Sequence, residues 1–143
     1  MTVYQRVVRG LLGAACALGA WSLSQAHHSF AMFDMSKQLT VVGTVRELEW
    51  VSPHIWLWID VPKGQGASDV YGFEGLGAGE MHRREGWSKS LFKPADKVTV
   101  QYAPFRSGKN GGRLVHVVLA DGHSLNAGAG DGGPPGGAPP PSP

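Results

Sequence analysis

Alternation of apolar and polar residues along the chain predicts a protein built mainly of β-strands. Residues 39–50 (LTVVGTVRELEW) are rich in β-branched side chains, and residues 54–61 (HIWLWIDV) alternate between an apolar face and a second face. Shorter runs of the same kind follow at residues 70–74, 97–103 and 113–120. Turns that contain glycine or proline separate the five runs, as expected between short strands.

A short helix is predicted between the third and fourth of these strands. Residues 80–85 (EMHRRE) have helical character, and Gly86 ends the segment. Three strands, a helix and two further strands follow one another in the order of an OB-fold, a small Greek-key barrel. We therefore expect a mainly β fold, a five-stranded OB-fold-like barrel with one short helix between strands 3 and 4.

Composition divides the chain into four parts. Basic residues followed by an apolar run at 11–23 and small residues are typical of a secretory signal peptide, here over residues 1–26. Residues 27–36 then form an N-terminal arm, and residues 37–125 form the barrel domain. The remainder, 126–143, is almost entirely Gly, Ala and Pro. Such a tail cannot bury enough apolar area to offset its ordering entropy, so we expect it to be disordered.

Processing after Ala26 predicts a periplasmic or secreted protein. Cys16 is the only cysteine and would leave with the signal peptide, so neither a disulfide nor a thiolate site would remain. Arg6 and Arg9 would also leave, which balances the 13 basic and 11 acidic side chains of the full chain. A balanced charge and an exported location give no case for nucleic-acid binding. No run after the signal peptide is long enough for an integral membrane span.

Cleavage after Ala26 would also place a histidine pair at the new N-terminus. His27 would carry the free amine, and His28 follows directly. An N-terminal histidine offers an amine and an imidazole in one chelate ring, a donor set that suits Cu(II) or Ni(II). His54, at the start of the second strand, can add a third nitrogen if the arm folds back. We therefore predict a copper site at His27, His28 and His54. The alternative is that each histidine is an ordinary surface or hydrogen-bonded side chain.

The second strand also presents an unusual outer face. Its apolar, barrel-lining residues are Ile55, Leu57, Ile59 and Val61. Its other face carries His54, Trp56, Trp58 and Asp60. Aromatic plates stack on flat ligands and sugar faces, and OB-folds bind through the face of strands 2 and 3. Together with Glu74, which ends the third strand, Trp56 and Trp58 are therefore candidate ligand-binding residues. The alternative is that the helix or the N-terminal arm covers both tryptophans in a second small core.

No motif in the sequence supports catalysis. We find no Ser/His/Asp order, no G-x-S-x-G, no phosphate loop before a helix and no H-E-x-x-H. We therefore assign no catalytic residue and favour a non-enzymatic binding protein whose partner is a metal ion, a small ligand or another periplasmic protein. Two alternatives stay open: an interaction module that uses the Trp56 and Trp58 face, and a copper-dependent redox enzyme.

Several short motifs resemble a family of small exported bacterial proteins. They are His27-His28-Ser29-Phe30, Phe33-Asp34, Gly43-Thr44-Val45, Trp50, Pro53-His54, Glu74, Gly86-Trp87, Leu91, Lys93-Pro94 and Asp96-Lys97-Val98-Thr99-Val100. The family is uncharacterised, a domain of unknown function, and the resemblance spans about residues 27–125. It implies export and a small β-rich domain, and it brings no established activity. This chain has Ser52 and Ala95 where the family usually has asparagine and glycine. The shorter Ser52 side chain is less able to reach and orient His54.

Overall fold

A computed structural model describes residues 28–128 of the protein. It separates into two compact units, the first ending at Ala31 and the second beginning at Met32. The first unit contributes one described element, the helix α2 (His28–Ala31). The elements of the second unit are β1 (Leu39–Glu49), β2 (Trp56–Gly64), β3 (Ala67–Glu74), α3 (Ala78–His82), β4 (Lys97–Pro104), β5 (Gly111–Leu119) and β6 (Ser124–Asn126).

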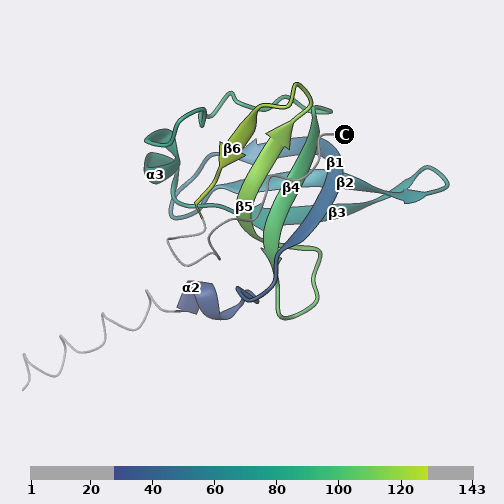
Figure 1. The fold of residues 1–143 in the computed structure, drawn as a ribbon, viewed down its shortest axis with the longest axis horizontal. Helices are drawn as coiled ribbons and strands as arrows, with labels where there is room; N and C mark the ends of the chain where they lie inside the picture. The colour runs from purple at the N-terminus through teal and green to yellow at the C-terminus, as the bar shows by residue number, and fades with distance from the viewer. Residues whose placement is uncertain (1–27, 129–143) are drawn as a thin grey trace, which may run out of the picture. The chain divides into compact units, whose positions relative to one another are not determined.

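The strands of the second unit close into a small barrel (Figure 1). Antiparallel neighbours follow the order β3-β2-β1-β4-β5-β6. Parallel pairing of β3 with β5, at Gly72↔Gly111 and Glu74↔Arg113, closes the first five strands into a cylinder. This connectivity, with α3 between β3 and β4, is that of an OB-fold. The predicted five-stranded barrel with its single short helix is therefore confirmed.

One glycine allows β1 to take part in both halves of the barrel. The first half of β1 pairs with β4 up to Thr44, and from Thr44 onward it pairs with β2. Gly43 lies at this change of partner, where a Cβ atom would stand 2.6 Å from the carbonyl oxygen of Asp60. A register shift between Val45 and Glu47 follows directly. The glycine seen inside the predicted strand thus permits the close strand crossing that closes the barrel.

The β2–β3 hairpin is longer than the sequence runs that predicted its strands, and it projects from the barrel (Figure 1). Its turn has positive φ angles at Gly64, Gln65 and Gly66, so the chain reverses tightly and Gly64 pairs with Ala67. The helix lies slightly earlier in the chain than predicted, because α3 begins at Ala78 rather than at residue 80.

The last strand, β6, lies at the edge of the sheet beside β5. It has only three residues, too few to give a periodic pattern in the sequence. It pairs with β5 at His116↔Asn126 and Val118↔Ser124. Leu125 at its centre is 2% exposed, and the following Ala127 is fully buried. The packed unit thus reaches past residue 125 at this end, and at the other end Phe33 is also buried in it, at 1% exposure.

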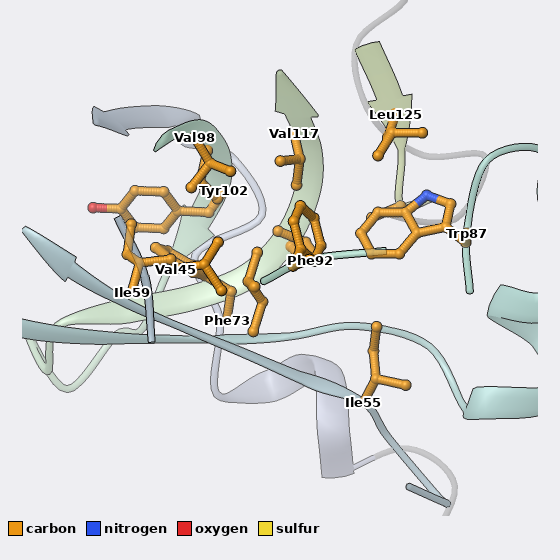
Figure 2. Packing of buried hydrophobic residues seen from close by; sticks show 14 of the residues in the cluster. Val45, Ile55, Ile59, Phe73, Trp87, Phe92, Val98, Tyr102, Val117 and Leu125 are labelled. Carbon is orange, nitrogen blue, oxygen red and sulfur yellow. The ribbon is translucent and has the colours of Figure 1, made fainter. Parts of the chain in front are cut away.

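Alternate residues of the strands fill the barrel interior. Ile55, Leu57 and Ile59 have no exposed surface, as the period of two in β2 predicted. The loop after α3 adds Trp87 to the buried cluster, where its indole donates a 2.9 Å hydrogen bond to the carbonyl oxygen of Asn126. Figure 2 shows Trp87 at one side of this cluster, far from Ile59. Since the inward-facing residues of β2 fill the core, the residues on its outer face can make other contacts.

Candidate functional site

The two tryptophans singled out from the sequence stack against each other on the outer face of β2. Their ring centroids are 5.4 Å apart, and the ring planes make an angle of 15°. Both side chains are half-buried. The indole N–H of Trp58 donates a 3.0 Å hydrogen bond to Oε1 of Glu49 on the neighbouring strand β1. This bond fixes the orientation of one ring, and stacking on it fixes the other.

Gly72 provides the space in which Trp58 lies. It is the direct partner of Trp58 across the β2–β3 pair. A Cβ atom at this position would stand 2.4 Å from Cζ3 of the indole, well inside van der Waals contact. Gly72 also meets Gly111 in the parallel β3–β5 pair, where a Cβ on Gly111 would stand 1.9 Å from the Gly72 carbonyl oxygen. The two glycines thus bring β5 and the loop before it close to the tryptophans.

An open cavity of about 640 Å³ lies over Trp56 and Trp58. Its remaining walls come from Gly72, from Met32 and from residues 105–107 and 109–110 of the β4–β5 loop. This volume falls within the range of ordinary small-ligand sites. Among the described residues, α3 contributes nothing to the lining and the N-terminal arm contributes only Met32. The alternative was that α3 or the N-terminal arm covers both tryptophans in a second small core. The tryptophans instead line an open cavity.

Backbone contacts hold the β4–β5 loop in place as a wall of the cavity. Phe33 forms an isolated antiparallel bridge with Phe105, and their rings lie 5.1 Å apart. The amide of Arg106 donates a 2.9 Å hydrogen bond to the carbonyl oxygen of Met32. On the opposite side of the loop, the carbonyl oxygen of Asn110 accepts a 3.4 Å hydrogen bond from the amide of Gly72. The wall is thus tied both to the segment before β1 and to the strand beneath Trp58.

Glu74 is not part of the cavity lining and lies beside His54 and Arg113. It pairs with Trp56 across β2–β3, yet the residue is only 4% exposed. Its Oε1 stands 3.4 Å from Nδ1 of His54 and 3.6 Å from Nη1 of Arg113. This oxygen makes no hydrogen bond within the described part of the chain. Arg113 in turn donates a 2.7 Å hydrogen bond to the carbonyl oxygen of Gly75.

Arg113 is the member of this cluster that sequence reasoning missed. It is 2% exposed, although it follows two glycines in what reads as an apolar strand. Burial lowers the pKa of Arg113, and the charge of Glu74 acts against that shift. A buried guanidinium needs such a partner. An arginine inside an otherwise apolar run was the available signal, and its partner could be found only from the parallel β3–β5 register.

His54 is oriented by contacts of one of its two ring nitrogens. Its Nδ1 stands 3.2 Å from the carbonyl oxygen of Gly75, in addition to the nearby carboxylate of Glu74. Both neighbours are acceptors, so this network assigns the hydrogen of the neutral ring to Nδ1 and the lone pair to Nε2. The side chain is one-third exposed.

The other two predicted copper ligands cannot be related to His54. His27 lies outside the described residues, and His28 belongs to the first unit. Among residues 28–128, no group of three or more His, Cys, Asp or Glu side chains is arranged to hold a metal ion. The copper site therefore stays a prediction, and the structure contributes to it only the orientation of His54.

A polar contact between two side chains joins β5 to β6. Ser124 Oγ and His116 Nε2 stand 2.5 Å apart, and partial burial lowers the pKa of His116. The pair is a cross-strand contact between β5 and β6.

The fold and the cavity define a small OB-fold-like barrel protein with a ligand-sized site on the outer face of β2 and β3. By sequence, the chain belongs to the family of unknown function DUF6152, whose profile matches residues 15–114. No curated protein and no solved structure matched the chain. Within the part that the structure describes, no helix has the length and apolar character needed to cross a membrane.

Proposed function

We propose that this protein is a non-enzymatic binding module that holds a small ligand against Trp56 and Trp58. The observation that carries the proposal is the open cavity with a pair of stacked indoles exposed in it. Two tryptophans left half-exposed forgo the apolar burial that a closed core would give them. A bound ring would recover part of that stabilisation.

The chemistry of the walls fits a small cyclic ligand. Stacking of a flat ring on an aromatic side chain is worth about 1–3 kcal/mol, as for bases on single-strand-binding barrels. Ser107 and Asn110 in the loop can hydrogen-bond to ligand hydroxyl or carbonyl groups. The cavity also occupies the face that OB-folds use for binding. Because the walls are tied in place by backbone bonds, little ordering would oppose binding.

Tryptophan emission tests this proposal directly. The full chain is titrated with cyclic ligands, namely sugars and aromatic carboxylates and amides, alongside Trp56→Leu and Trp58→Leu. The matched control is Trp50→Leu, a half-buried tryptophan packed against the core and absent from the cavity lining. We expect a ligand-dependent change in emission that is lost in both cavity variants and kept in the control. Acrylamide quenching that finds Trp56 and Trp58 fully shielded in the free protein would contradict the proposal.

Copper binding in an exported protein is a second candidate function, and the orientation of His54 favours it. Metal-binding histidines commonly donate their second ring N–H to a carbonyl or carboxylate, which fixes the ring and raises its basicity. Gly75 and Glu74 stand in that relation to Nδ1 of His54 and leave Nε2 as the donor. With the amine and imidazole of a processed His27 and the ring of His28, His54 would complete a nitrogen site for Cu(II).

Export and metal binding can be tested together by mass. Protein recovered from the periplasm is weighed intact under native and denaturing conditions, and a chain that begins at His27 with one labile copper is expected. Cu(II) affinity should fall in the His27→Ala, His28→Ala double variant and in His54→Ala. It should stay unchanged in His82→Ala, an exposed histidine on α3. A different N-terminus, or equal Cu(II) affinity in all variants, would rule this function out.

A further inference from the structure

We propose that the ligand of the Trp56 and Trp58 cavity is a ring compound that carries a negative charge, and that Lys109 and Arg106 bind its charged group. The inference rests on the proposed binding function and specifies its ligand class. A carboxylate on a sugar ring and a carboxylate on an aromatic ring share this chemistry. The inference is based on the charged residues of the cavity wall rather than on Trp56 and Trp58.

The charge of the cavity lining has a single sign. Lys109 and Arg106 are its two charged residues, both exposed on the β4–β5 loop, and no carboxylate is among the lining residues. The acid that lies beside the tryptophans, Glu49, accepts the hydrogen bond from Trp58 and is not part of the lining. Because the whole chain has a net charge of only +2, this concentration of positive charge is local.

Neither cation makes a short ion pair in the described part of the chain. Lys109 makes no ion pair there. Nη1 of Arg106 approaches Oδ1 of Asp34 only to 4.0 Å. That carboxylate already accepts a 2.6 Å hydrogen bond from Ser36 Oγ and pairs with Lys37 at 3.0 Å. The hydrogen bonds from Ser36 and Lys37 lower the pKa of Asp34 from 3.8 to about 2, so its charge is engaged by these neighbours.

The loop presents both cations from a fixed backbone. Arg106 is tied to Met32 by its amide, and Asn110, next to Lys109, accepts a hydrogen bond from Gly72 beneath the indoles. Gly108 between them has φ +76°, a turn conformation that favours glycine. Two cations held beside the indole rings favour a ligand in which a charged group is attached directly, or by a short linker, to the ring that stacks on the indoles. Charge-assisted hydrogen bonds to a carboxylate are about twice as strong as neutral ones.

The experiment uses two probe pairs, each made of a charged ligand and an uncharged analogue of similar shape. The first is trigalacturonate with its methyl ester, and the second is 2-naphthoate with 2-naphthamide. Each is titrated by calorimetry into the full chain, Lys109→Gln and Arg106→Gln, at low and at high salt. The matched control is Lys89→Gln, an exposed lysine outside the cavity. Glutamine keeps most of the side-chain length and removes the charge.

We expect the charged member of at least one pair to bind about tenfold or more tightly than its neutral partner, as a charge-assisted contact implies. That preference should shrink in Lys109→Gln and Arg106→Gln, weaken at high salt and persist in Lys89→Gln. The pair that responds shows whether the ring is a sugar or an aromatic one. Equal affinity for charged and neutral members would overturn the inference and leave the binding function standing. Absence of binding by all four probes, with unchanged tryptophan emission, would count against both.

Discussion

Replacing Gly72 with alanine tests how Trp58 lies on the barrel. The new Cβ would stand 2.4, 2.8 and 2.9 Å from three atoms of the indole ring. Carbon atoms in favourable contact are about 3.5–4.0 Å apart, so the ring must move by roughly 1 Å. The ring cannot move toward β3, and the cavity is the open space beside it. We therefore expect the alanine variant to keep its fold and to lose part of its cavity.

The energetic consequence follows from the contacts that hold Trp58. A displacement of this size breaks the 3.0 Å hydrogen bond to Glu49, whose net worth is about 0.5–1.5 kcal/mol. It also disturbs the stack on Trp56, worth about 0.5–1.5 kcal/mol. Alanine in a strand recovers about 0.5–1 kcal/mol of backbone stability over glycine. The free energy of unfolding should thus fall by about 1 kcal/mol, given these opposing terms.

Urea unfolding and the indole N–H resonances in NMR spectra measure these effects. We expect the Trp58 indole resonance to shift and any cavity ligand to bind about tenfold or more weakly, because a displaced ring occupies ligand space. The control is Gly79→Ala in α3, where a Cβ meets nothing within 4 Å. That change should be neutral or stabilising by up to about 1 kcal/mol. A Gly72→Ala variant with an unshifted Trp58 resonance and undiminished stability would refute this account of the site.

Three further predictions concern the rest of the unit. Trp87→Phe leaves the Asn126 carbonyl without its indole donor, so the free energy of unfolding in urea should fall by about 1–3 kcal/mol; a change near zero would contradict that bond. Ser36→Ala should raise the pKa of Asp34 from about 2 toward 3.8 in an NMR titration, and the stability that this low pKa contributes is present above pH 3.8 and lost as the pH falls toward 2. Burial lowers the pKa of His116 below 6.5, so the unfolded state binds the proton at a higher pH than the folded state does. The free energy of unfolding should therefore fall as the pH drops through 6.5. In His116→Gln, that part of the decrease in the urea midpoint should be absent.

The alternation of β2 shows how far local sequence can reach. A period of two assigns each residue to one face regardless of what packs there, so Leu57 was correctly placed inside and Trp58 outside. The order of strands and helix was sufficient to predict the OB-fold connectivity. Turn residues separated the strands but did not fix their ends, because the turn at residues 64–66 lets pairing continue beyond the apolar run.

The site itself depends on contacts between segments that are distant in the chain. Glu74 was predicted as a ligand-binding residue together with the tryptophans. It pairs with Trp56 across β2–β3, and the parallel pairing of β3 with β5 also sets it beside Arg113, so it is not part of the cavity lining. Lys109 and Met32 had no signal of their own, because a loop lysine and an arm methionine are ordinary surface residues in a sequence. The Phe33–Phe105 bridge brings the segments that carry them together.

By itself, the sequence determined the five barrel strands, their order and which side chains of β2 face inward, because these follow from the period of the backbone and from turn chemistry. Only the tertiary structure decided which loop stands over Trp56 and Trp58 and where the buried charges meet. Closure of the barrel sets the register between β3 and β5, and that register is a long-range property that no local pattern encodes. The cavity and its positive wall are products of that closure.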